Sequence, residues 1–117
     1  MNKEELKART KKFALRVINL TNALPNTKAG NVISSQLLRS GTSVGANYRA
    51  VCLSKSKADF ISKLGIVVEE ADESAFWMEL IIESKLIPEF LINNLLNETY
   101  EIVAIMVSSR KSAMKNK

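Results

Sequence analysis

The chain has 117 residues, of which 46% are hydrophobic, and its 17 Lys and Arg against 12 Asp and Glu give a net charge of +5. This length and composition predict a soluble protein with one hydrophobic core, and no apolar run is long enough to cross a membrane. With no histidine and the single cysteine Cys52, the sequence excludes His-based acid–base catalysis, a Cys/His zinc site and an internal disulfide. The charged start "MNKEELKARTKKF" lacks the apolar segment of a secretory signal, so we expect a cytoplasmic protein.

Apolar residues recur at spacings of three and four, and few prolines or glycines interrupt them, which predicts an all-α protein. The first helix is expected over residues 3–24 and ends at Pro25. Asn26 or Thr27 can cap a second helix that continues to residue 53. The third helix is expected over residues 56–85, because "SKAD" places an acid at the third position after Ser56. Pro88 suits the first turn of a fourth helix, over residues 88–113.

Short connections make consecutive helices antiparallel, so residues 1–117 are predicted to form a single up-down-up-down four-helix bundle. If the second and third helices reverse near Ser54, residues at the same height have numbers that sum to about 109, since both helices rise about 1.5 Å per residue. This height rule predicts which residues of the two helices lie side by side.

Two glycines four residues apart, Gly41 and Gly45, occur inside the second helix, in the stretch "LLRSGTSVGANYRA". They share one face and allow a close backbone approach or a bend, at about 1 kcal/mol per glycine relative to alanine. The height rule places them beside Val68 and Leu64 of the third helix. A phosphate-binding loop is the alternative, but neither GxGxxG nor GxxxxGK[ST] is present. We therefore interpret the stretch as a packing device.

Acidic residues gather in the third helix at Glu69, Glu70, Asp72 and Glu73. A di-iron carboxylate bundle would need a histidine three residues after a glutamate, and the chain has none. We interpret these acids as a solvated face or as ion-pair partners, with Arg39 at the height of Glu70. No metal, cofactor or enzymatic activity is predicted.

The runs "RSGTSVGANYRA" and "SKSKADFISKLGIVVEEADESAFWMEL" resemble the bacterial family of 23S rRNA-intervening-sequence, or S23-like, proteins over about residues 35 to 85. The matching positions are Arg39, Ser43, Val44, Asn47, Arg49, Ser56, Phe60, Lys63, Leu64, Glu70, Ala71, Glu73 and Trp77. The residues interpreted as structural are Arg39, Gly41, Ser43, Gly45, Asn47, Arg49, Phe60, Lys63, Glu70, Glu73 and Trp77. Trp77 has two interpretations, as a core residue or as an anchor at a subunit interface.

The resemblance implies a small bundle that assembles into a homo-oligomeric ring, typically a pentamer, without an established enzymatic activity. A related branch is the accessory protein of diversity-generating retroelements, a pentamer that binds nucleic acid and a reverse transcriptase. The width of the apolar stripes independently predicts oligomerisation, because the fourth helix has more apolar residues than one buried face needs.

Charge is divided along the chain: residues 1–20 carry +4, 21–63 carry +5, 64–104 carry −8 and 105–117 carry +4. In an up-down-up-down bundle the start of the first helix and the end of the last share one end, which predicts a basic pole for nucleic-acid phosphates. The candidate residues are Lys7, Lys11, Lys12, Arg16, Arg110 and Lys111.

Two functional hypotheses follow. The protein either binds RNA or DNA through this basic pole, or it is an oligomeric scaffold for a protein partner. In the second case the basic residues serve only helix dipoles and solubility.

Overall fold

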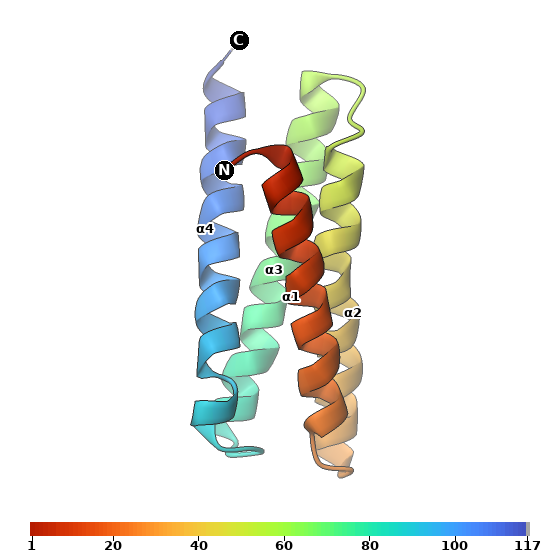
Figure 1. The fold of residues 1–117 in the computed structure, drawn as a ribbon, viewed down its shortest axis with the longest axis vertical. Helices are drawn as coiled ribbons and strands as arrows, with labels where there is room; N and C mark the ends of the chain where they lie inside the picture. Colours follow the sequence, from red (N-terminus) through yellow and green to blue (C-terminus); the bar gives the residue numbers. More distant parts are fainter. Residues whose placement is uncertain (117) are drawn as a thin grey trace.

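The computed structural model describes residues 1–116 as an antiparallel bundle of four helices, 49 × 21 × 19 Å in extent (Figure 1). The elements are α1 (Lys3–Ala23), α2 (Lys28–Val51), α3 (Lys57–Glu83), the short 3-10 helix η1 (Glu89–Leu91) and α4 (Asn93–Lys115). The predicted all-α fold is confirmed. No helix in the described part of the chain is long and apolar enough to cross a membrane.

The start of the fourth helix was predicted five residues too early. Pro88 has the expected φ of −60°, but it precedes only the single turn η1. The chain then bends at Ile92, where φ is −124°. Ile92 is completely buried, so the bend turns this side chain into the core, and α4 begins at Asn93.

Side-chain caps fix the starts of the first three helices. Asn2 accepts a hydrogen bond from the backbone N–H of Glu5 at 2.8 Å, and the Glu5 carboxylate accepts one from the N–H of Asn2, which completes a capping box. Thr27 and Ser56 each accept a bond at 3.0 Å from the backbone N–H three residues on. The caps expected at Thr27 and Ser56 are therefore confirmed.

Gly41 and Gly45 face α1, so the prediction that they lie against the third helix is wrong. A Cβ on Gly41 would lie 2.7 Å from Cγ1 of Val17, and a Cβ on Gly45 would lie 3.2 Å from the carbonyl oxygen of Thr10. The two glycines thus allow the backbones of α1 and α2 to approach closely. The height rule predicts position along the helix axis, but it does not determine which neighbouring helix a residue faces.

Polar contacts join α2 to α3 close to the heights that the rule predicted. Arg39 forms ion pairs with Glu70, at 3.5 Å, and with Glu73. Directly after Arg39 in α2, Ser40 accepts a hydrogen bond at 3.0 Å from the hydroxyl of Ser74, and both serines are fully buried. The Arg39–Glu70 pair matches the predicted sum of 109, whereas the short side chains of Ser40 and Ser74 meet at a sum of 114.

The bundle is least closed between α1 and α4. Figure 1 shows α1 near α4 at its N-terminal end and inclined away from it toward the other end. Arg9 joins the two helices through Glu98, at 2.7 Å, and Glu101, at 3.0 Å. Further along, a hollow of about 420 Å³ lies between α1 and α4, beside the highly exposed Phe90.

Candidate nucleic-acid interface

One end of the bundle brings together the start of α1, the loop between α2 and α3, and the end of α4 (Figure 1). Arg110 of α4 donates from Nε to the carbonyl of Ile61 at 3.1 Å. The ammonium group of Lys3 lies 6.0 Å from the centre of the Phe60 ring. We call this region the basic end, and its basic residues are Lys3, Lys7, Lys11, Arg49, Lys55, Lys57, Lys63, Arg110, Lys111 and Lys115.

Two acidic residues of the basic end have ion-pair partners. Glu4 pairs with Lys7 at 3.1 Å, and Asp59 pairs with Lys63 at 3.1 Å. The backbone N–H of Lys55 also donates to Asp59, and this bond, followed by that from Lys63, holds the pKa of the Asp59 carboxyl below its usual range. Within residues 1–116, the basic-end residues that form no ion pair are Lys3, Lys11, Arg49, Lys55, Lys57, Arg110, Lys111 and Lys115.

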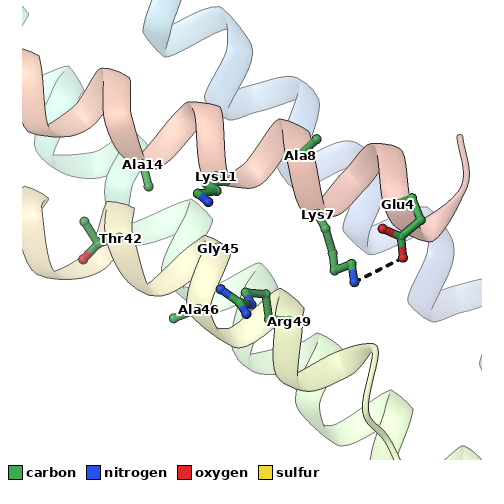
Figure 2. A pocket seen from close by; sticks show the side chains of 9 residues that line it. All are labelled: Glu4, Lys7, Ala8, Lys11, Ala14, Thr42, Gly45, Ala46 and Arg49. Carbon is green, nitrogen blue, oxygen red and sulfur yellow. Dashed lines mark ion pairs between the residues drawn. The ribbon is translucent and has the colours of Figure 1, made fainter.

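A shallow hollow of about 480 Å³ lies between α1 and α2, and we call it the α1–α2 groove. It exists because the helices pack closely at Gly45 and the residues around it have short side chains. Figure 2 shows Lys7 and Arg49 reaching into it from the two helices. The lining residues are Glu4, Lys7, Ala8, Lys11, Ala14, Thr42, Gly45, Ala46 and Arg49.

Arg110 and Lys111 line a second hollow, of about 300 Å³, between α3 and α4, with Gly65, Val68 and Glu69. The hydrogen bond from Arg110 to the backbone of α3 gives that side chain a structural role. Lys111 is exposed and makes no such bond.

Lys12 and Arg16 lie on a third surface, the side of α1 that faces α4. The hydrogen bond from Arg9 is the main cause of the lowered pKa of Glu98, and the positive charges of Arg16 and Lys12 lower it further. Arg16 also lines the hollow beside Phe90, toward the opposite end of the bundle. The six candidate residues therefore occupy three separate surfaces.

Arg49, Lys55 and Lys57 also lie at the basic end, although they are not among the six residues predicted to bind phosphates. The up-down topology predicts this position, because a bundle that brings the start of α1 and the end of α4 together places the α2–α3 loop at that same end. Their place in mid-sequence hides this proximity, because the two chain ends are the more evident basic segments.

The residues of the family motif form a polar network on the outer side of α2 and α3. Trp77 is half-buried, and its indole Nε1 donates to Glu73 at 3.1 Å, so Glu73 receives both Trp77 and Arg39. The Phe76 ring packs edge-on against Trp77, with 5.0 Å between ring centres. This network holds α2 and α3 together, and the partly buried Trp77 packs against the hydrophobic core.

The remaining motif residues stabilise local structure. Ser43 donates to the carbonyl of Arg39, and Asn47 donates to the carbonyl of Ser43 at 2.8 Å, so both bond back along α2. Phe60 packs against the core and lies beneath Lys3. In residues 1–116, no group of three or more Cys, Asp or Glu side chains is arranged to hold a metal ion.

The family model of the 23S rRNA-intervening sequence proteins matches residues 3–108. The chain belongs to this family. It is also similar to the crystal structure, at 1.70 Å resolution, of a protein of unknown function from the S23 ribosomal protein family of Bacteroides thetaiotaomicron, with 39% identity and a TM-score of 0.86. That similarity covers 95% of this chain and 99% of the other.

No curated protein matches the sequence. The resemblance seen over residues 35 to 85 is confirmed, and family membership extends it to α1 and most of α4. The relation to retroelement accessory proteins stays a prediction.

Proposed function

We propose that this family member is a non-enzymatic protein that binds the phosphates of RNA or DNA through its basic end. One observation carries the proposal: lysine and arginine side chains from α1, the α2–α3 loop and α4 gather at one end without ion-pair partners among the described residues. Unpaired lysine and arginine side chains contribute strongly to the affinity for a polyanion, because each phosphate that they neutralise releases condensed counterions.

The distribution of negative charge also favours an orientation in which the basic end faces the nucleic acid. Residues 64–104 carry a net charge of −8, and they form most of α3 and the first half of α4. The molecule is therefore positive at one end and negative over much of the remainder, so the field of a nucleic acid would turn the basic end toward the backbone.

Among residues 1–116, the basic end has no exposed aromatic side chain on which single-stranded bases could stack, since Phe60 is packed against the core beneath Lys3. Contacts to phosphates carry no direct sequence information. We therefore expect binding with little sequence preference and a strong dependence on salt.

The experiment compares two variants that lose the same charge. In the end variant, Lys55, Lys57, Lys111 and Lys115 become Gln. In the control variant, Lys12, Arg16, Lys28 and Lys85 become Gln, all outside the basic end. Binding to short RNA and DNA duplexes is measured across a salt series. Because each phosphate contact contributes about 0.9 to the slope of log K against log salt, the four lost contacts of the end variant should lower the slope by about 3.6.

The control variant should keep the slope of the wild type. Two results would overturn the proposal: equal losses in both variants, which would show that only net charge matters, or no binding by the wild type at low salt. Circular dichroism checks that each variant is folded.

A further inference from the structure

Three cations from two helices surround the α1–α2 groove. They are Lys7, Lys11 and Arg49, and the single acid of the lining is Glu4. Three positive charges and one negative charge leave the groove at +2. Lys11 and Arg49 form no ion pair among residues 1–116. Glu4 pairs with Lys7, but its side chain is 83% exposed, and ion pairs at the surface stabilise little. All three cations can therefore be recruited by an anion.

The cations lie on the facing sides of the two helices. Gly45 of α2 lies against Thr10 of α1. Because the helices are antiparallel, Arg49 is level with Lys7, one turn nearer the basic end. Lys11 follows Lys7 by one turn on the same face of α1, about 6 Å along the axis. Figure 2 shows Lys7 and Arg49 reaching into the groove from opposite sides, so an anion between them contacts both helices.

Among the lining residues, the hydrogen-bond donors of the groove are these charged side chains. The hydroxyl of Thr42 already donates to the carbonyl of Leu38 at 2.6 Å. The other lining residues, apart from Glu4, are alanine and glycine. A guanidinium can bind two oxygens of one phosphate, and the ammonium groups add further donors. A nucleoside on the alanine floor would meet methyl groups, so its base would matter little.

The volume and charge of the groove fit one compact dianion. Its volume of about 480 Å³ is in the range of small-molecule sites. A phosphate monoester has a charge of about −1.5 to −2 at neutral pH, whereas a phosphate within a nucleic-acid strand has about one. The monoester therefore matches the charge of the groove. The hollow between α3 and α4 fits less well, because Glu69 lines it and Arg110 already donates to Ile61.

We propose that the α1–α2 groove binds a phosphate monoester on a nucleoside, which is either the terminal phosphate of a nucleic-acid strand or that of a free nucleotide. The strand-end form rests on the proposed function. In that form the exposed cations beside the groove bind internal phosphates, and the groove adds a preference for strands with a phosphorylated end. The residues beside the groove are Lys55, Lys57, Lys111 and Lys115.

Binding to two sets of short duplexes tests the preference. One set has a terminal phosphate, at the 5′ or the 3′ end, and the other is identical but has hydroxyl ends. The wild type should bind a phosphorylated duplex about tenfold more tightly, since a single hydrogen bond to a charged group contributes about this factor.

The groove variant combines Lys7→Gln, Lys11→Gln and Arg49→Gln, and it should bind both duplexes equally. Ala46→Phe should have the same effect, because it fills the groove without altering charge, and Ala46 is exposed, so the bundle should still fold. The control variant loses the same charge outside the groove and should keep the preference; it combines Lys12→Gln, Arg16→Gln and Lys28→Gln. Circular dichroism checks the fold of each variant.

The end variant separates this inference from the proposed function. With its four lysines replaced, both duplexes should bind more weakly, but in the same ratio as to the wild type. A wild type that binds both duplexes equally, with a steep salt dependence, and that does not bind adenosine monophosphate would leave the proposed function intact and overturn this inference.

Calorimetry with adenosine monophosphate, compared with adenosine, distinguishes the two sources of the phosphate. Binding of the monophosphate that the groove variant loses supports a site for free nucleotides. A preference for phosphorylated duplexes without binding of the monophosphate supports a site for strand ends. A groove variant that keeps the preference, or a control variant that loses it, would overturn the proposal. Displacement of these ligands by a short polyglutamate peptide at equal concentration would also overturn it, in favour of an acidic protein partner.

Discussion

Gly41→Ala adds one methyl group at the closest approach of α1 and α2. The new Cβ would lie 2.7 and 2.8 Å from the two γ-methyl groups of Val17, which is completely buried. A β-branched side chain in a helix has little rotamer freedom, so both overlaps must be relieved by moving a helix. Overpacking costs about 1 to 3 kcal/mol, and two simultaneous overlaps belong near the upper limit, whereas alanine returns about 1 kcal/mol of helix propensity. We expect a net loss of about 2 kcal/mol in the free energy of unfolding.

Thermal and urea unfolding followed by circular dichroism measure this loss, and Tm should fall by roughly 5 to 10 °C for a chain of this size. Gly65→Ala is the comparison: its Cβ would lie 3.2 Å from Nε of Arg110, a flexible side chain that needs to shift only slightly and can do so at the expense of its hydrogen bond to Ile61, so the loss of stability should be smaller than that of Gly41→Ala. In a Val17→Ala background, Gly41→Ala should become stabilising. A Gly41→Ala protein as stable as the wild type, or one that Val17→Ala fails to rescue, would refute this packing argument.

Three further predictions concern stability. Gly45→Leu should cost about 1 to 3 kcal/mol in a urea titration, because its side chain would meet the backbone of α1; an unchanged midpoint would contradict this. The hydrogen bond from Arg9 lowers the pKa of Glu98 below its ordinary 4.5, so its stabilisation is present at neutral pH and disappears as pH falls through and below that value. Glu98→Gln should be about 1 kcal/mol less stable at neutral pH, and a gap that persists in acid would argue against this pair. Burial raises the pKa of Tyr48 to about 12, and a hydrogen bond to a glutamate raises that of Tyr100 to about 12; tyrosinate absorbance should therefore appear near pH 12, with stability complete below pH 10 and declining above it.

The sequence predicted the helices and their relative heights, because periodicity and axial rise are local properties. The Arg39–Glu70 pair follows from the rise alone. The helix against which Gly41 packs does not follow from the rise. It depends on rotation about the helix axis and on the order in which four helices surround the core. Its neighbour Ser40, 100° away around α2, is the residue that meets α3.

The same rotation explains why the basic pole was only partly predicted. Lys11 and Lys12 are adjacent in sequence, yet one borders the α1–α2 groove while the other lies toward Glu98 of α4. Net charge along the chain predicts which end is basic. Which groove each basic residue lines can be determined only from the assembled bundle.

The limited contact between α1 and α4 has a consequence for how the chain folds. Since α1 packs chiefly on α2, α2 on α3, and α3 on α4, nearly all native contacts join segments that are close in sequence. Folding rates rise as contacts become more local, and helical bundles of this topology commonly fold in microseconds to milliseconds. The junction between the first and last helices, which Arg9 joins through Glu98 and Glu101, is the least extensive of those between neighbouring helices in the described part of the chain. Assembly can therefore proceed hairpin by hairpin as the chain is synthesised, and the last helix completes a core that the first three have already begun.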